Sequence, residues 1–168
     1  MASDHPTELD PSVLRPSGAL LATQIALGAA IERHAVAPSE HDATTLDLLV
    51  RLDIGPEDGL RAAELCRQLK LSPSHISRMV DRAEAAGLVE RRPDPVDRRA
   101  KVVVLTAAGR REVGRFAPRL HAVLDRVIHR VLSTEEIDRL VGYLERIEAA
   151  ADTFPGPDGP DGPGAQTT

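Results

Sequence analysis

Apolar residues recur at helical spacing in the first part of the chain. A first helix is predicted to follow Ser17 and to run to about Ala35; its apolar residues cover much of its circumference, so we expect it to pack on two sides. After a restart at Pro38, a second helix is predicted to end near Ile54, because glycine and proline follow there and stop a helix. Residues 60–69 indicate a third, short helix.

The fourth helix has the clearest start and stop signals. Ser72 is predicted as its N-cap and Pro73 as its first helical residue, where the missing N–H costs nothing. Gly87 is the expected left-handed stop. The predicted buried stripe consists of Ile76, Met79, Val80 and Ala83. The residues left facing outward are Ser74, His75, Ser77, Arg78, Asp81 and Arg82.

A hairpin and two more helices are predicted after Gly87. Residues 88–92 and 101–105 are rich in β-branched side chains and indicate two short strands joined by a basic loop. Thr106 is expected to cap the next helix, and Pro118 to kink or divide it. A capping box that begins at Ser133 predicts the start of the last helix.

Composition favours a mostly helical protein with one folding unit. The 168 residues include one Tyr, two Phe and no Trp, so the core must consist of aliphatic side chains, which suits packed helices. Residues 1–16 and the Pro- and Gly-rich residues 154–168 are predicted to be disordered, and a solubilising tail without a task of its own is the favoured interpretation of the latter.

The net charge of −5 conceals a basic centre. Residues 61–115 contain 13 Lys and Arg against seven Asp and Glu, a local charge of +6, which leaves −11 for the rest. A basic region between acidic flanks is the electrostatic pattern of a protein that binds nucleic acid.

Several classes of function are not expected. The sequence has no apolar run of membrane-spanning length and no signal segment, which predicts a cytoplasmic protein that does not enter a membrane. A single cysteine forms neither an intramolecular disulfide nor a cysteine zinc site. No phosphate loop, metal cluster or nucleophile with its base is recognisable, so we expect no enzyme, no cofactor and no bound metal.

The predicted order of helices and hairpin is that of a winged helix-turn-helix, and four segments resemble the MarR family in particular. They are residues 65–69 (LCRQL), 71–82 (LSPSHISRMVDR), 87–99 (GLVERRPDPVDRR) and 104–109 (VLTAAG). The resemblance covers about residues 46–109. It implies a transcriptional regulator, with a DNA-binding domain at residues 38–106 and a helical dimerisation region at residues 17–37 and 107–153.

The family resemblance implies an obligate homodimer whose fourth helices enter the major groove of a palindromic double-stranded operator. Apolar surface on the outer helices independently favours a partner chain. The candidate contacts on the fourth helix are Ser72, Ser74, His75, Ser77, Arg78 and Arg82. For Arg78, a guanine contact and a phosphate contact without sequence preference remain open alternatives.

The candidate wing contacts are Asp97, Arg98 and Arg99. The family pattern Asp-x-Arg falls on Asp97 and Arg99, which implies that the carboxylate orients the guanidinium toward the minor groove. The alternative is a solvated charge run on a loop.

Other residues depart from the family or match its special branches only weakly. Arg61 occupies a place where many relatives have a Ser or Thr cap, so the third helix is expected to start irregularly. Cys66 is interpreted as an inert core thiol rather than a reactive sensor. The histidines near the first two helices, and His121 with His129, are interpreted as surface residues rather than as metal ligands.

The leading prediction is a repressor relieved by a small aromatic or lipophilic effector, as the family resemblance implies. The alternative is a constitutive winged-helix interaction module without a ligand response.

Overall fold

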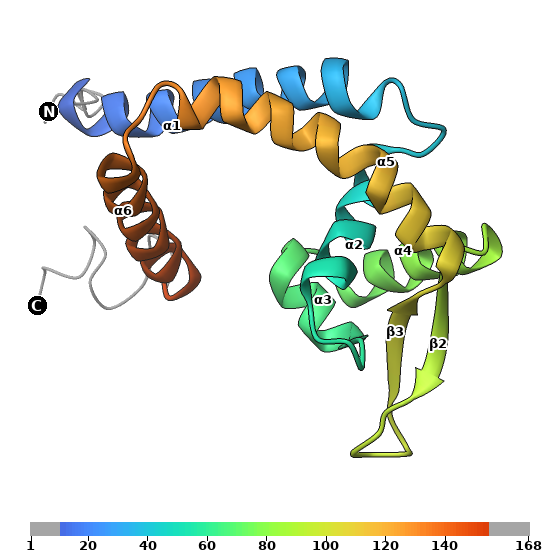
Figure 1. The fold of residues 1–168 in the computed structure, drawn as a ribbon. Helices are drawn as coiled ribbons and strands as arrows, with labels where there is room; N and C mark the ends of the chain where they lie inside the picture. Colours follow the sequence, from blue (N-terminus) through green and yellow to red (C-terminus); the bar gives the residue numbers. More distant parts are fainter. Residues whose placement is uncertain (1–10, 155–168) are drawn as a thin grey trace, which may run out of the picture. The chain divides into compact units, whose positions relative to one another are not determined.

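The computed structural model describes residues 11–154 and divides the chain into two compact units (Figure 1). The first unit ends at Val123 and the second begins at Leu124. The predicted disorder of residues 1–10 and 155–168 lies outside the described residues. No described helix is long and apolar enough to cross a membrane.

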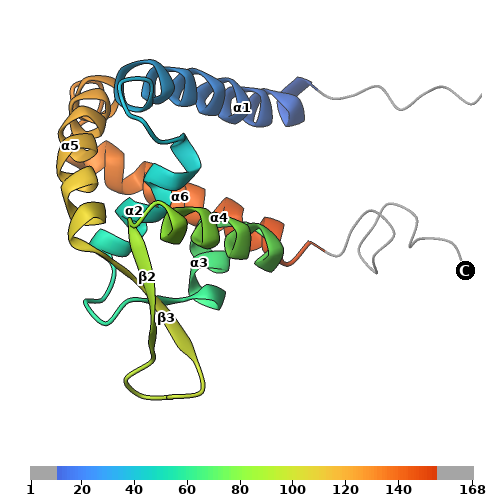
Figure 2. The ribbon, with the colours of Figure 1, turned by 90° about the vertical axis from the view of Figure 1, so that its right-hand side faces the viewer.

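The first unit contains a winged-helix lobe, with three helices and a small antiparallel sheet. The elements are α2 (Ala43–Ile54), β1 (Leu60–Arg61), α3 (Ala62–Leu69), α4 (Pro73–Ala85), β2 (Val89–Pro93) and β3 (Lys101–Leu105). The strand order is β1-β3-β2, and Arg61 and Arg92 both pair with Val102 on opposite sides of β3. In both views the β2–β3 hairpin projects beyond the helices as a wing (Figures 1 and 2).

One aliphatic core holds the helices of this lobe to the sheet. Leu48, Leu49, Leu65, Ile76 and Met79 have no exposed surface, and they pack with apolar residues of all three strands. Because removal of apolar surface from water is the main favourable term in folding, this core fixes α4 to the rest of the lobe. The predicted buried stripe of the fourth helix is confirmed.

Two glycines with positive φ angles lie where helices and strands meet. Gly59 has a φ of +92°, and a Cβ at this position would lie 2.5 Å from the carbonyl oxygen of Val103. The chain therefore approaches β3 closely enough to form β1, so residues 60 and 61 are a strand rather than the predicted start of the third helix. Gly87, with a φ of +70°, follows α4 as predicted.

The first helix begins earlier than predicted. Helix α1 (Pro11–Ile31) includes Pro16 and Ser17 and continues into the π-helical turn η1 (Glu32–Val36). Residues 11–16, predicted to be disordered, are therefore helical. A proline in the second turn removes only one helical hydrogen bond, and the hydroxyl of Ser17 donates to the carbonyl of Leu14 at 2.9 Å instead of capping a helix.

A second small core joins η1, α2 and the helix that follows the wing. Helix α5 (Ala107–Leu124) contributes Phe116, which packs with Ala35, Val36 and Leu46. Thr106 caps α5 as predicted, since its hydroxyl accepts the backbone N–H of Gly109 at 3.1 Å. Pro118 lies inside α5 and does not divide it; a π-helical turn, η2 (Asp125–His129), comes after the helix instead.

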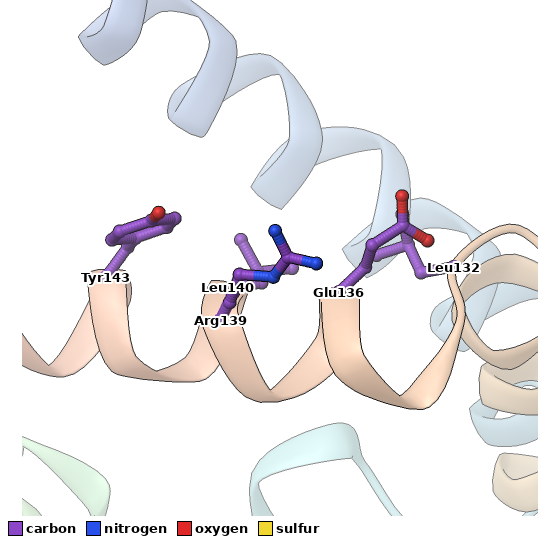
Figure 3. Close-up of a pocket in the computed structure, with 5 residues that line it drawn as sticks. All are labelled: Leu132, Glu136, Arg139, Leu140 and Tyr143. Atoms are coloured by element: carbon purple, nitrogen blue, oxygen red, sulfur yellow. The ribbon is translucent and has the colours of Figure 1, made fainter.

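The second unit consists of η2 and helix α6 (Thr134–Asp152). The predicted capping box is present: the hydroxyl of Ser133 accepts the backbone N–H of Glu136, and the Glu136 carboxylate accepts the backbone N–H of Ser133 at 2.8 Å. No residue of α6 is buried. Five residues line a hollow on one side of this helix, namely Leu132, Glu136, Arg139, Leu140 and Tyr143 (Figure 3).

Candidate nucleic-acid interface

Helix α4 is apolar on its buried side and polar on its exposed side. The hydroxyl of Ser72 accepts the backbone N–H of His75 at 3.4 Å, and Pro73 starts the helix, so the predicted cap is confirmed. The six candidate contacts of this helix are all exposed, namely Ser72, Ser74, His75, Ser77, Arg78 and Arg82. The sequence thus identified the exposed face of α4 correctly.

Three basic or titratable side chains of α4 lie at helical spacing on that face. His75, Arg78 and Arg82, together with Asp81, line a surface hollow. The Nε of Arg78 donates to the carbonyl of Ser74 at 3.3 Å, which directs the Arg78 side chain back toward the start of the helix. Amide groups at a helix start favour an anion, so this end of α4 suits a phosphate or a base acceptor.

An arginine of the wing holds α4 to β2, a contact that the sequence reasoning missed. Arg91 forms ion pairs with Glu84 and, at 2.5 Å, with Asp81. Its backbone N–H also donates to Glu84 at 3.1 Å. Arg91 thus neutralises both carboxylates of α4 from the side of β2. The exposed face of α4 therefore keeps its positive charge. Only the basic content of residues 87–92 hinted at this role.

The wing loop is held by two carboxylates. Asp94 accepts the backbone N–H groups of Val96 and Asp97, at 2.8 and 3.0 Å. Asp97 in turn accepts the backbone N–H of Arg99 at 3.0 Å. This last contact differs from the expected orientation of a guanidinium by Asp97, because the carboxylate holds the main chain of Arg99 and not its side-chain head.

The two arginines at the tip of the wing face solvent. Arg98 and Arg99 are exposed, and neither guanidinium has a hydrogen bond or an ion pair within residues 11–154. Their donors are thus available for an external acceptor, and a guanidinium has five of them. The predicted wing residues lie together in one loop, and the predicted helix residues lie together on α4.

Arg61 behaves differently from a helix cap. Its side chain points away from α3, and its Nε donates to Asp94 at 2.6 Å. Its backbone N–H donates to the Glu64 carboxylate at 2.7 Å. Glu64 supplies the local capping contact, and α3 starts at Ala62 as an ordinary helix. This contact is the Glu half of a capping box; the other half, in which an N-cap hydroxyl accepts an N–H of the first turn, is not made by the Arg61 side chain.

Within residues 11–154, Cys66 and the histidines are not grouped as metal ligands. Cys66 is partly buried and packs against the main core of the lobe. Nε2 of His41 lies 4.0 Å from the Glu112 carboxylate. Among residues 11–154 there is no group of three His, Cys, Asp or Glu side chains placed to hold a metal ion.

Comparison with known proteins agrees with this geometry. A model of the MarR family matches residues 42–100, which include α2, the helix-turn-helix and most of the wing. Over these residues, called the MarR-family region below, the chain is similar to the MarR family. The MarR-family region contains every residue that the sequence nominated as a candidate contact.

Relatives extend the comparison beyond the MarR-family region. YcgE of Bacillus subtilis, an uncharacterized HTH-type transcriptional regulator, is 35% identical over 94 residues, which are 55% of this chain and 60% of YcgE. The match thus spans less than two thirds of that relative. The crystal structure of Sco3205, a MarR family regulator from Streptomyces coelicolor in complex with DNA, is 25% identical, covers 91% of this chain and 95% of Sco3205, and has a TM-score of 0.73.

A third relative carries a small molecule. The crystal structure of CouR from Rhodococcus jostii RHA1 bound to p-coumaroyl-CoA is 26% identical, covers 86% of this chain and 91% of CouR, and has a TM-score of 0.61. The winged helix-turn-helix fold of this chain is therefore that of solved MarR family regulators.

Proposed function

We propose that the protein is a sequence-specific DNA-binding transcriptional regulator of the MarR type. The observation that carries the proposal is the pairing of an exposed polar face on α4 with two unpaired arginines at the wing tip. Helix α4 enters the major groove, where a helix fits and base edges differ, and the wing follows the minor groove, whose negative potential attracts arginine. The structure of Sco3205, a similar protein in complex with DNA, supports DNA as the binding partner.

The same proposal assigns the candidate contacts to two grooves. On α4 the residues are Ser72, Ser74, His75, Ser77, Arg78 and Arg82. In the wing, Arg98 and Arg99 reach the minor groove, and Asp97 holds the main chain that carries Arg99. Cytoplasmic location and the absence of enzymatic activity belong to the same proposal, since the role requires only access to DNA.

The regulator acts as a homodimer through its terminal helices. On α1, Leu21 and Ile25 are 60% and 72% exposed, and on α6, Tyr143 and Ile147 are 56% and 50% exposed. Apolar surface of this extent is normally covered, and a second copy covers it with matching helices. The proposed dimerisation region comprises residues 17–37 and 107–153, and the DNA-binding domain residues 38–106.

A dimer with two-fold symmetry requires a palindromic operator. The centres of the two half-sites should lie about one helical turn, roughly 10 bp, apart. Selection of bound duplexes from random DNA, followed by footprinting, tests both the function and the symmetry. A high-affinity footprint on one asymmetric half-site would contradict the docking, and failure to enrich any sequence would contradict the function.

A small effector relieves repression in this proposal. The complex of CouR with p-coumaroyl-CoA supports a ligand that is aromatic or lipophilic. A panel of aromatic acids and acyl thioesters should contain a compound that raises the melting temperature and releases the selected duplex, because a ligand that favours one state shifts the equilibrium between states. The alternative, a constitutive winged-helix module, predicts that stabilising compounds leave DNA affinity unchanged.

A further inference from the structure

Asp94 is the one buried charged residue of the described chain. It is 5% exposed and begins the wing loop, immediately after β2. Its Oδ1 accepts two backbone N–H groups of the loop, and its Oδ2 accepts Nε of Arg61. A buried carboxylate is costly unless it is paired and hydrogen-bonded, and here three donors compensate it.

Arg61 connects this carboxylate to the helix-turn-helix. Its main chain pairs with Val102 in the sheet, and its backbone N–H is held by Glu64 in the first turn of α3. Arg61 and Asp94 are 33 positions apart in sequence. The side chain of Arg61 thus reaches from the start of α3, past the first residues of β3, to the start of the wing loop.

The electrostatics of the pair make this link persistent. The hydrogen bond from Arg61 is the first cause that lowers the pKa of Asp94 to about 2, and the amides of Asp97 and Val96 add to it. The same hydrogen bond raises the pKa of Arg61. Both groups therefore stay charged at every pH at which the protein is expected to meet DNA.

We propose that the Arg61–Asp94 pair is a tether that sets the position of the wing relative to α3 and α4, and that Arg61 is a positioning residue for the minor-groove contacts. The inference rests on the proposed function. Without the tether, Asp94 keeps a buried charge with one donor fewer, and the loop that carries Arg98 and Arg99 loses its side-chain contact with Arg61.

A direct phosphate contact is the competing role for Arg61, whose side chain is 44% exposed. Its Nε already donates to Asp94, so a phosphate contact would have to use the terminal nitrogens of the guanidinium. The two roles differ in what happens when Asp94 is neutralised. A direct contact becomes stronger when a nearby negative charge is removed, whereas a tether fails.

The first test needs no DNA. Trypsin cleaves after arginine, so the rate of cleavage after Arg98 and Arg99, followed by mass spectrometry, measures how firmly the loop is held. Arg61→Met should raise this rate about tenfold, and Arg61→Lys, which keeps a charge, should raise it less. Arg51→Met is the matched control, because it breaks an exposed pair with Asp47 on α2. A rise of less than threefold in Arg61→Met would overturn the tether.

The second test uses a duplex selected by the parent protein from random DNA. Arg61→Met should weaken binding about tenfold. In the variant that carries both Arg98→Ala and Arg99→Ala, the further change Arg61→Met should not weaken binding, because Arg61 acts through the wing. Asp94→Asn should also weaken binding, although it removes a negative charge near DNA. Circular dichroism confirms that each variant is folded.

Each result of the second test decides the inference. If Arg61→Met still weakens binding when Arg98→Ala and Arg99→Ala are both present, or if Asp94→Asn binds more tightly, Arg61 contacts DNA by itself and the positioning role is wrong. If the parent protein enriches no duplex, the proposed function and with it the DNA role of Arg61 fail, while the protease rates still show whether the loop is tethered.

Discussion

Arg78 and Arg99 lie on separate elements, and the proposed docking places them in different grooves. Arg99→Ala should weaken binding to many sequences and reduce the salt slope of the binding constant by about one unit, because its contact depends on phosphate field and groove shape. Arg78→Ala, if it contacts a guanine, should remove about 1–3 kcal/mol of discrimination at one base pair. Titrations of the selected duplex and its single-base variants at several salt concentrations measure both effects.

The control for this pair of variants is Asp97→Ala. It frees the main chain of Arg99 without removing a guanidinium, so it should resemble a milder Arg99→Ala. If Arg99→Ala bound DNA as tightly as the parent protein at every salt concentration, the wing would not take part in binding. Equal loss at all base pairs in Arg78→Ala would instead indicate a phosphate contact.

Asp94 gives a pH dependence whose sign follows from its lowered pKa. The folded-state pKa of about 2 lies below the ordinary value of 3.8, so the ionised carboxylate stabilises the fold fully above about pH 4, and this contribution disappears as the pH falls toward 2. Asp94→Asn should be less stable than the parent at pH 7 and should converge with it in acid. Urea unfolding at several pH values tests this, with the exposed Asp47→Asn as control. A constant difference down to pH 2 would contradict it.

At the scale of elements, Gly109 in the first turn of α5 lies close to the main chain that leads into the wing. A Cβ at Gly109 would lie 2.1 Å from the carbonyl oxygen of Leu88. Because this oxygen belongs to the main chain, no change of side-chain rotamer can relieve the clash. Gly109→Ala should therefore destabilise the protein by about 1–3 kcal/mol or more, because overpacking forces the backbone to move. Thermal unfolding measures the change.

Gly114 is the matched control within the same helix. Nothing lies within 4 Å of a Cβ built there, so Gly114→Ala should stabilise α5 by roughly 0.5–1 kcal/mol through reduced backbone entropy of the unfolded chain. If both variants changed the melting temperature in the same direction, the close approach at Gly109 would not be the cause.

Elements with local signals were predictable, and those that depend on distant contacts were not. The caps at Ser72, Thr106 and Ser133 combine a hydroxyl with the residues of one turn, so the sequence alone identified them. Strand β1 has two residues and exists only because Gly59 brings the chain to β3. A pattern read along the chain contains no trace of such a pairing.

The candidate site shows the same division. The exposed faces of α4 and the wing tip follow from periodicity and from the family pattern, and the structure places their residues as expected. The ion pairs of Arg61 with Asp94 and of Arg91 with Glu84 join separate elements, and charge in the sequence does not tell which partners meet. The sequence interpretation therefore identified the exposed candidate residues but missed the ion pairs that hold their elements together.

At the scale of the whole molecule, dimerisation should depend on the terminal helices. Deletion of residues after Thr134 should produce a monomer and abolish tight DNA binding, because α6 and its exposed apolar side chains are lost. Leu144→Glu should do the same with the helix intact, since the side chain is 41% exposed and its substitution leaves no cavity. Sedimentation at micromolar concentration gives the result.

Ile54→Glu is the control for the dimer variants. Ile54 is 72% exposed at the end of α2, outside the proposed dimerisation region, so the same chemical change there should leave the sedimentation coefficient unaltered. A monomeric parent protein would contradict the dimer, and dimers of Leu144→Glu would place the interface elsewhere.

The strand order β1-β3-β2 also protects the protein from aggregation. Strand β3 contains the buried run Val102, Val103, Val104 and Leu105, and such a run is prone to pair with other chains when its edges are open. Here β3 is central, the edge strand β2 carries Glu90, Arg91 and Arg92, and β2 ends in Pro93, which has no N–H to offer. A second copy that approached this edge would therefore meet charged side chains instead of an apolar strand.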